Sequence, residues 1–418
     1  MKRLYPSRNG KPTFLHVFAS ALVLALAGWF AAAGCGSDSG SGSEGSKTRT
    51  VKLSGEADFR SLQQCIDEAA NGDTCLVYAG IYPGTVRFNG KAILVKSVDG
   101  PEQTTLDGDF LKQDGQGDDT VVRFMDNEGA GAILDGFTVR NGAAAHHGGG
   151  IYIEAASPTI RNCIIQGNSA AGDGGGVYCF GSTARPLIRN TVIQENTAQG
   201  QGGALCALYA SPNLINCLLF GNEAKAQRGH AVSARERAAV TMENCTVADN
   251  KADEDGDGLG GGLYLLHSTA TVLNSILWAN EARAGSQAYL ELPVSPDEPP
   301  PLDLRYTDLQ GGRAGVVVGE ADCSTSPTPN SCLGIEDTLL QADPLFHCFP
   351  GKEDPNCYYL SQEGDPSTWS PCVNAGDPLQ IIGELGIEER TTSIDEKLDT
   401  DFIDLGYHYA VVEQEPSP

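Results

Sequence analysis

The stretch of residues 133–282 carries one pattern of apolar and polar positions in six copies. In each copy a polar residue stands two positions after an apolar one, with an Asn six positions later and an Ala eight positions later. The polar residues are spaced 27, 28, 26, 28 and 30 residues apart and are Asp135, Asn162, Asn190, Asn216, Asn244 and Asn274. A period of about 20 to 50 residues predicts a solenoid, in which each repeat buries its apolar face only by stacking on its neighbours.

Residue types alternate within each copy, which predicts short β-strands. Ile151 and Ile153 would point to one side of such a strand, with a polar or aromatic residue between them. The alternation breaks at the polar residue, because Ile160 and Ile165 would both point inward although they are an odd number of positions apart. The chain must therefore bend at Asn162, a residue type that tolerates left-handed backbone angles. Short strands joined by tight corners predict an all-β, parallel β-helix fold.

The second recurrent Asn column predicts a ladder of side-chain amides. Stacking places equivalent residues of adjacent coils about 4.8 Å apart, so their amides can hydrogen-bond along the stack. The members of this column are Asn141, Asn168, Asn196, Asn222, Asn250 and Asn280. We expect the Asn columns to stabilise the fold rather than to take part in catalysis.

Glycine-rich motifs open most copies and carry a family resemblance. The motifs are GGGIY at 148–152, GGGVY at 174–178, GGALC at 202–206 and GGGLY at 260–264. They resemble the repeats of right-handed parallel β-helix proteins with the pectate-lyase-like superfold. The pairing of GGAL with FGN at 220–222 is similar to the repeats of chlamydial polymorphic outer-membrane proteins. The resemblance implies a right-handed solenoid but does not define a function.

The first 50 residues predict a secreted, lipid-anchored protein. Basic residues precede an apolar run from Phe14 to Ala33, and Cys35 follows a small residue, as in a bacterial lipobox. We expect residues 1–34 to be a signal peptide, Cys35 to carry lipid, and residues 35–50 to be a flexible tether. The alternative is an uncleaved transmembrane helix. The lipid anchor implies the membrane as a partner and a location at the outer membrane or cell surface.

Cysteine usage agrees with an oxidising compartment. If Cys35 of the thirteen cysteines carries lipid, an even number remains. Short sequence separations predict three disulfides, Cys65–Cys75, Cys323–Cys332 and Cys348–Cys357. The pairing of the other six cysteines stays open.

Two further regions flank the repeats. The segment Asp58–Ala70 is expected to form an amphipathic helix with Asp58 as its N-cap, covering the open edge of the first coil. The β-helix with this cap is expected to span residues 51–285. Residues 286–418 are expected to contain the final coils, disulfide-bearing loops and a closing segment.

The charge of the chain excludes one class of partner. The formal net charge is −26, and removal of residues 1–34, which contain four basic and no acidic side chains, changes it to −30. Such a surface repels nucleic acid, so no nucleic-acid partner is expected.

A dense group of acidic side chains, Asp253, Asp255 and Asp257, resembles the start of a calcium-binding loop. An EF-hand would place Glu at position 264, where this chain has Tyr264. The group is therefore typical either of a calcium site or of a solvated acidic loop. Calcium is the only cofactor that the sequence suggests.

Tyr152 and Tyr178 alternate with inward apolar residues on adjacent coils and are expected to form an outward aromatic strip. Such a strip could bind a polysaccharide, or it could simply stabilise neighbouring strands. Motifs for a polysaccharide lyase or hydrolase are not recognisable, although an enzyme with an unrecognised site is the alternative. The sequence thus favours a non-catalytic surface protein for adhesion to a polysaccharide or to another surface protein.

Overall fold

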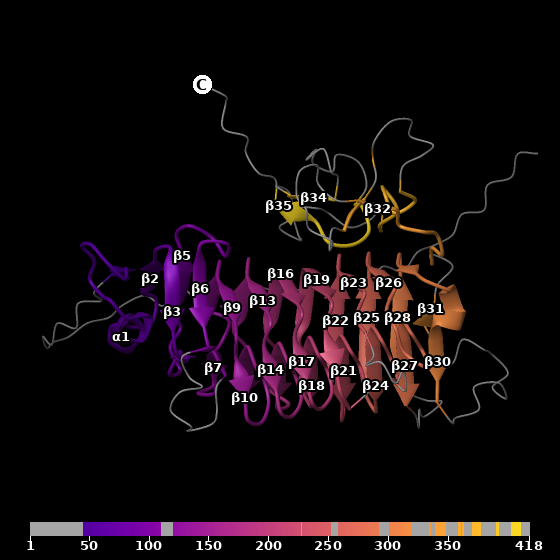
Figure 1. The fold of residues 1–418 in the computed structure, drawn as a ribbon, viewed down its shortest axis with the longest axis horizontal. Coiled ribbons are helices and arrows are strands. Elements are labelled where there is room, and N and C mark those ends of the chain that lie inside the picture. The colour runs from indigo at the N-terminus through magenta and orange to yellow at the C-terminus, as the bar shows by residue number, and fades with distance from the viewer. Residues whose placement is uncertain are drawn as a thin grey trace, which may run out of the picture. The chain divides into compact units, whose positions relative to one another are not determined.

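A computed structural model describes residues 45–109, 120–226, 228–251, 258–291 and 301–319, with short segments at 334–335, 339–347, 358–360, 362, 370–377, 390–392 and 403–410. The described residues from Ser46 onward belong to one compact unit. In it the chain winds into stacked coils whose strands pair in parallel with the coils before and after (Figure 1). The predicted all-β parallel β-helix is confirmed.

One side of the coils is a nine-stranded parallel sheet. Its strands are β4 (Val86–Arg87), β7 (Val122–Phe124), β11 (Ile151–Glu154), β15 (Val177–Phe180), β18 (Leu205–Leu208), β21 (Val232–Arg235), β24 (Leu263–Leu266), β27 (Ala288–Glu291) and β30 (Val316–Val318). A small four-stranded sheet precedes it in the middle coils. That sheet contains β10 (Ala143–Ala144), β14 (Ser169–Ala170), β17 (Thr197–Ala198) and β20 (Glu223–Ala224).

The eighteen-stranded sheet, called the corner sheet here, bends at the predicted corners and forms two rows. The row before the corner contains β1 (Thr48–Val51), β2 (Thr74–Val77), β5 (Leu94–Ser97), β8 (Ile133–Asp135), β12 (Thr159–Arg161), β22 (Ala239–Glu243), β25 (Thr269–Leu273), β28 (Leu302–Arg305) and β31 (Gly334–Ile335). The row after it contains β3 (Gly80–Pro83), β6 (Thr104–Asp107), β9 (Thr138–Arg140), β13 (Ile164–Gln166), β23 (Thr246–Ala248), β26 (Ile276–Trp278) and β29 (Asp308–Leu309). Two longer strands, β16 (Leu187–Gln194) and β19 (Asn213–Phe220), run through the corner and join the rows.

The corner residues adopt the left-handed conformation that the broken alternation predicts. The φ angles are 53°, 51°, 52°, 51° and 49° at Asn162, Asn190, Asn216, Asn244 and Asn274. Each corner therefore re-aims the next strand so that apolar side chains on both sides of it enter the core. A fully buried aliphatic side chain contributes about 1.5 to 3 kcal/mol to folding, and these side chains form one continuous core.

The first copy of the repeat is shifted by one residue from the predicted alignment. Leu134 pairs with Ile160, so the residue opposite Asn162 is Gly136, which has a φ of 83°. Leu134 is fully buried, whereas the preceding Ile is not. The assignment of Asp135 as the first corner is therefore wrong, because a slip of one residue exchanges the inward and outward faces of a strand.

The predicted amide ladder is present in the second Asn column. Its five buried side chains are those of Asn168, Asn196, Asn222, Asn250 and Asn280. Nδ2 of each of the first four donates to Oδ1 of the next, at 2.9, 3.0, 3.0 and 2.9 Å, and Nδ2 of Asn280 donates to Gln287 at 2.8 Å. The one-residue shift removes Asn141 from the ladder. Its Nδ2 donates to Asp107 at 3.0 Å, and the backbone N–H of Gly142 takes the ladder position instead.

The N-terminal helix is shorter than predicted. Helix α1 (Leu62–Glu68) begins after Ser61, and the carboxylate of Asp58 accepts hydrogen bonds from Thr50 instead of capping the helix. The helix buries Leu62, among others, against β1, β2 and β4. No helix in the described part of the chain has the length and apolarity needed to cross a membrane.

The C-terminal segments add two antiparallel pairs. These are β32 (Phe346–His347) with β33 (Tyr359–Leu360), and β34 (Arg390–Thr391) with β35 (Tyr409–Ala410), while η2 (Gly312–Gly315) is a short 3-10 helix before β30. Tyr407 packs against Leu218 and Phe220, which point outward from the corner sheet. The backbone of His408 donates to Oδ1 of Asn216 and accepts from its Nδ2. This part of the chain therefore covers one side of the solenoid.

Candidate functional site

The outward face of the nine-stranded sheet does not offer the exposed tyrosine strip expected from the sequence. Tyr178 is only 4% exposed because the ring of His147 stacks on it, with centroids 4.5 Å apart and an interplanar angle of 15°. Tyr152 is half-buried, and the centroid of its ring lies 5.5 Å from that of Tyr178. Burial raises the pKa of Tyr178 above its usual range. The prediction that both rings are open to a sugar is wrong for Tyr178.

Glycine causes this closure. Gly148, the residue after His147, has a φ of 69°, and a Cβ on Gly172 of the next coil would lie 2.6 Å from Nδ1 of His147. A side chain at Gly172 would therefore push the His147 ring out of its place. The same closure leaves Tyr264 fully buried, with Arg228 5.7 Å from its ring centroid. The sequence showed that these tyrosines leave the core, but not that the loops fold back over them.

The polar side chains on this face form a closed network. Arg235 donates to the carboxylate of Asp173 and to Sγ of Cys206, the latter at 3.5 Å. Ser233 donates to Gln201 at 3.0 Å. Burial raises the pKa of Cys206 to about 12, so its thiol is protonated at neutral pH and is not an activated nucleophile. The network fixes coil spacing rather than presenting reactive groups.

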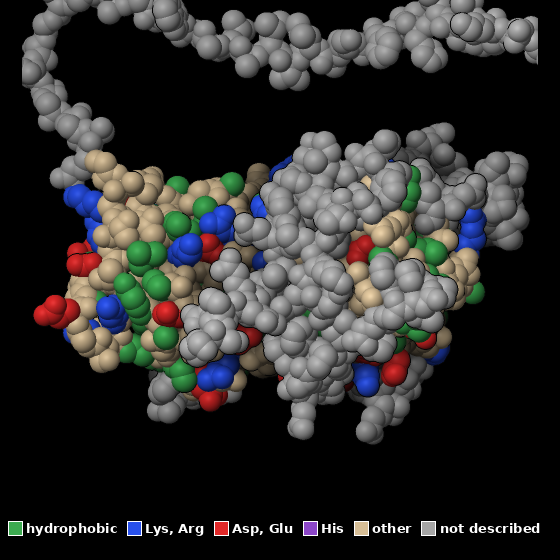
Figure 2. Space-filling view, turned by 90° about the horizontal axis from the view of Figure 1, so that it is seen from above, with side chains coloured by type: hydrophobic (Ala, Val, Ile, Leu, Met, Phe, Trp, Pro, Cys, Tyr) green, Lys and Arg blue, Asp and Glu red, His purple; other side chains and the backbone are tan. Residues whose placement is uncertain are grey.

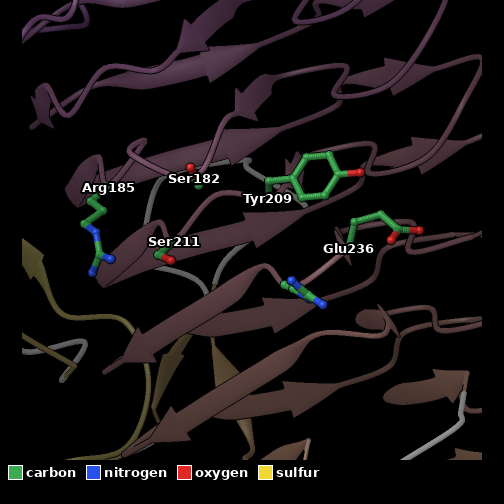
Figure 3. A pocket seen from close by; sticks show the side chains of 6 residues that line it. Ser182, Arg185, Tyr209, Ser211 and Glu236 are labelled. Atoms are coloured by element: carbon green, nitrogen blue, oxygen red, sulfur yellow. The ribbon is translucent and has the colours of Figure 1, made fainter.

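An open site lies instead where the chain leaves the nine-stranded sheet for the corner sheet. The strand register shows that residues 181–186, 209–212 and 236–240 are equivalent segments of three successive coils, the last of which runs into β22 at Ala239. The segments differ in length, and the middle one is the shortest in this alignment. A pocket of about 530 Å³ lies at these three segments. We call it the turn pocket, and Figure 3 shows the side chains that line it.

Each of the three turns contributes two residues to the turn pocket. They are Ser182 and Arg185, Tyr209 and Ser211, and Glu236 and Arg237. Tyr209 lies in the middle turn with 45% of its surface exposed. Its ring meets that of Phe180 edge-on, with the two ring centroids 6.3 Å apart. Tyr209 and Glu236 occupy the same left-handed turn position, with φ angles of 60° and 54°. Figure 3 shows the tyrosine ring face-on to the viewer, without another side chain drawn over it.

The charges of the turn pocket differ from those of the whole chain. Among its lining residues Arg185 and Arg237 are basic and Glu236 is the single carboxylate, which gives a formal charge of +1 in a chain of −26. The described residues provide no hydrogen bond or ion pair to either guanidinium. Sequence reasoning missed this site because it concentrated on strand positions. The unequal lengths of the turns were the available signal.

Metal binding has no support from the described residues. Asp253, Asp255 and Asp257 lie outside them, so the calcium prediction stays a prediction. In the part of the chain that is described, no three His, Cys, Asp or Glu side chains are grouped as a metal site. His230 is fully buried, and its Nδ1 accepts from the backbone N–H of Ala224.

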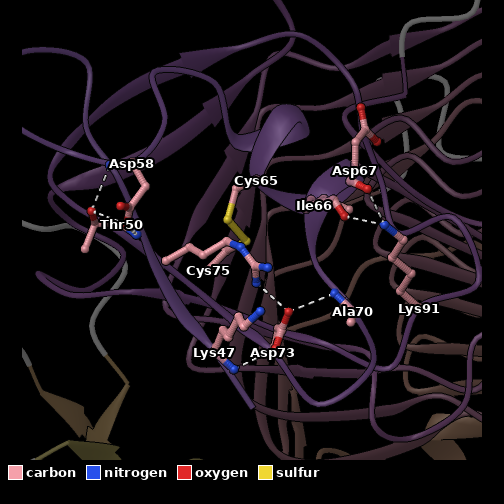
Figure 4. Close-up of polar contacts among 11 residues, drawn as sticks. Lys47, Thr50, Asp58, Cys65, Ile66, Asp67, Ala70, Asp73, Cys75 and Lys91 are labelled. Atoms are coloured by element: carbon pink, nitrogen blue, oxygen red, sulfur yellow. Dashed lines mark hydrogen bonds and ion pairs between the residues drawn. A yellow bond between two sulfur atoms is a disulfide. The ribbon is translucent and has the colours of Figure 1, made fainter. Parts of the chain in front are cut away.

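The covalent sites are partly described. Cys65 and Cys75 are joined by a disulfide that ties α1 to β2 (Figure 4). Beside it, the backbone N–H groups of Lys47 and Ala70 and the guanidinium of Arg49 lower the pKa of Asp73 below its usual range. These contacts anchor the start of the solenoid. Five predicted covalent-site residues lie outside the described residues, namely Cys35, Cys323, Cys332, Cys348 and Cys357.

Known proteins resemble the chain at the level of fold. A family model described as a right handed beta helix region matches residues 121–290. Among solved structures, pectate lyase Pel9A is similar with a TM-score of 0.50 and 14% identity, over 87% of this chain and 96% of that one. Pectin methylesterase from carrot gives a TM-score of 0.43 and 14% identity, over 71% and 94% of the two chains. The comparison with curated proteins gives no match. The chain therefore has the fold of a right-handed parallel β-helix.

Proposed function

We propose that this protein is a lipid-anchored, extracytoplasmic surface protein that binds a saccharide in the turn pocket without transforming it. The observation that carries the proposal is the exposed ring of Tyr209 in a pocket that is lined from three successive coils. An aromatic surface for stacking, surrounded by a few hydroxyl and charged groups, is the usual composition of a small-molecule site. The rigid β-helix holds these groups on three adjacent coils.

The anchor and the compartment rest on the sequence. The apolar run before Cys35 and the Ser/Gly-rich tether after it are typical of a lipoprotein. The Cys65–Cys75 disulfide supports an oxidising compartment. A tethered solenoid at the outer membrane or cell surface would present the turn pocket to saccharides outside the cell.

The chemistry of the turn pocket favours binding over catalysis. A glycoside hydrolase usually needs two carboxyl groups on either side of the scissile bond, and the lining residues include only Glu236. The outward face of the nine-stranded sheet is closed by Tyr178 and its neighbours. The alternative function, a polysaccharide lyase or hydrolase, would require a second reactive group next to Glu236.

The test uses the mature lipidated protein, purified in detergent, on a saccharide array. We expect binding by the wild type and its loss in Tyr209→Ala. The matched control is His267→Ala, because His267 is exposed and lies at the same left-handed turn position two coils further on, outside the pocket. Mass spectrometry of the bound saccharides should show no product. Product formation that depends on Glu236 would establish the enzyme instead, and absence of any saccharide binding would refute the proposal.

A further inference from the structure

We propose that the first coils of the solenoid dock on the bilayer that holds the lipid anchor, through an apolar patch formed by Leu53, Ile81 and Val98. These three side chains are called the membrane patch here. The inference rests on the lipid anchor of the proposed function and adds a second, direct contact between the folded domain and the membrane. It is carried by the position of the patch in the first three coils, directly after the tether.

The membrane patch contains half of the large hydrophobic side chains that are exposed in the described part of the chain. Of six such side chains, Leu53, Ile81 and Val98 are 46%, 49% and 45% exposed. Leu53 lies against β3, because its Cδ1 would be 2.8 Å from a Cβ on Gly80, the residue before Ile81. Figure 2 shows hydrophobic side chains at the surface beside basic and acidic ones at the end of the solenoid with the first coils.

The strand register places Val98 near the other members of the membrane patch. β1, β2 and β5 pair in parallel, and the residues that directly follow these strands are Lys52, Tyr78 and Val98. They are therefore stacked on adjacent coils, about 4.8 Å apart. Nζ of Lys52 lies 4.0 Å from the ring centroid of Tyr78. A lysine and a tyrosine at the edge of an apolar patch suit a membrane interface, because each has an apolar body and a polar end that reaches the headgroups.

The charge near the membrane patch fits an anionic bilayer. Residues 46–60 contain four basic and two acidic side chains, so their formal charge is +2 in a chain of −26. The guanidinium of Arg60 donates to the backbone oxygen of Lys52 at 3.2 Å, which holds it beside the patch. Asp99, next to Val98, accepts from the backbone N–H of Ala79 at 2.8 Å. An anionic surface attracts basic side chains and repels the acidic remainder of the chain, so this end would face the bilayer.

The length of the tether keeps this end of the solenoid close to the lipid. Eleven residues separate Cys35 from Lys47, and a chain of this length spans at most about 40 Å. β1 begins at Thr48, so the first coil is the part of the folded domain that this limit holds nearest to the bilayer. Docking of the membrane patch is then an intramolecular step, and a weak apolar contact is sufficient for it.

The experiment measures the contact of single positions with lipid chains. The mature lipidated protein is reconstituted in vesicles of phosphatidylcholine and phosphatidylglycerol in equal parts, with brominated acyl chains that quench tryptophan fluorescence. Ile81→Trp should lose fluorescence relative to the same variant in unbrominated vesicles. The matched control is Leu345→Trp, an exposed apolar residue outside the patch, which should not. The parent protein corrects for its own tryptophans.

A second set of variants tests the charges. In the Ile81→Trp protein, the double change Lys52→Gln/Arg60→Gln should reduce the quenching, and so should high salt, because both weaken attraction to the anionic lipid. The control is Lys251→Gln, which removes a positive charge at an exposed position in a later coil and should leave the quenching unchanged.

The outcomes separate this inference from the proposed function. Quenching at Ile81→Trp alone, reduced by the double charge variant, supports docking through the membrane patch. No quenching at either position, or equal quenching at both, in a protein that carries its lipid would overturn the inference, while saccharide binding and the anchor stand. Absence of lipid on Cys35 in the mass spectrum would overturn the anchor and this inference together.

Discussion

Replacement of Asn222 by Leu tests the amide ladder at its centre. The Oδ1 atom of Asn222 accepts from the backbone N–H of Asn196 at 3.1 Å and from its Nδ2 at 3.0 Å. Its own Nδ2 donates to Asn250 at 3.0 Å and to the backbone oxygen of Ile193 at 2.9 Å. The side chain is fully buried, so water is not available to replace these bonds.

The magnitude follows from the groups that lose their partner. In Asn222→Leu, two donors of Asn196 lose their acceptor, the backbone N–H and one hydrogen of Nδ2. A buried unsatisfied group costs about 1 to 3 kcal/mol, so the expected loss of unfolding free energy is about 2 to 6 kcal/mol. Asn168→Leu should cost about half as much, because only the backbone N–H of Gly142 depends on its Oδ1.

Urea denaturation monitored by circular dichroism would measure both variants. The control is Asn141→Gly, which keeps the left-handed backbone of a residue outside the ladder and removes one hydrogen bond to Asp107, so it should cost about 1.5 kcal/mol. Because solenoid stability is roughly a sum of nearest-neighbour terms, the central change should also separate unfolding into two transitions. A loss for Asn222→Leu as small as that for Asn141→Gly would refute the reasoning.

Three further changes have defined outcomes. Cys35→Ser should block lipid attachment and leave unprocessed precursor, which mass spectrometry and membrane fractionation would detect; release of a normally matured protein would contradict the lipobox assignment. The double variant Cys65→Ala/Cys75→Ala should lose about 2 to 4 kcal/mol in denaturant titrations, because the disulfide closes a loop with a sequence separation of 10; an unchanged midpoint would argue against it. Burial raises the pKa of Asp308 to about 6. The protonated side chain therefore stabilises the folded chain fully below a pH of about 4, and this stabilisation is lost as the pH rises through 6. Asp308→Asn should therefore raise stability at pH 7 by about 3 kcal/mol and flatten the curve between pH of about 4 and 6; unchanged pH dependence would show that another group is responsible.

The repeat was predictable because each recurrent residue has one local physical reason. The backbone of one coil and its neighbour determines where each of these residue types is needed. Asn is needed at a left-handed corner and in the buried ladder, and Gly is needed where two backbone segments approach closely. The corner of the first copy was assigned to the wrong residue because it has no Asn. Gly136 adopts the left-handed conformation there, as Asn162 does in the next coil, and a pattern of polar corner residues does not include a glycine.

The candidate site was harder to predict because it depends on differences between coils rather than on what they share. Tyr178 leaves the core as the alternation predicts, but its exposure depends on where His147 folds. Tyr209 lines a pocket together with residues from the coils before and after its own. Both facts require the register of neighbouring coils, which a single sequence does not contain explicitly.

The two Asn columns have the same signature in the sequence and different roles in the structure. The ladder column satisfies itself, since each amide finds its partner in the next coil. The corner column is satisfied only in part by its own members. Asn216 donates to Asn190 at 2.9 Å, but it also exchanges two hydrogen bonds with the backbone of His408. Asn244 donates to the backbone oxygen of Asp404. The corner amides lie at the outside of a bend, where donors and acceptors remain free for an added segment, and the C-terminal chain uses them together with the apolar surface around Leu218. The regularity that builds the solenoid therefore also supplies the surface on which its last segment docks.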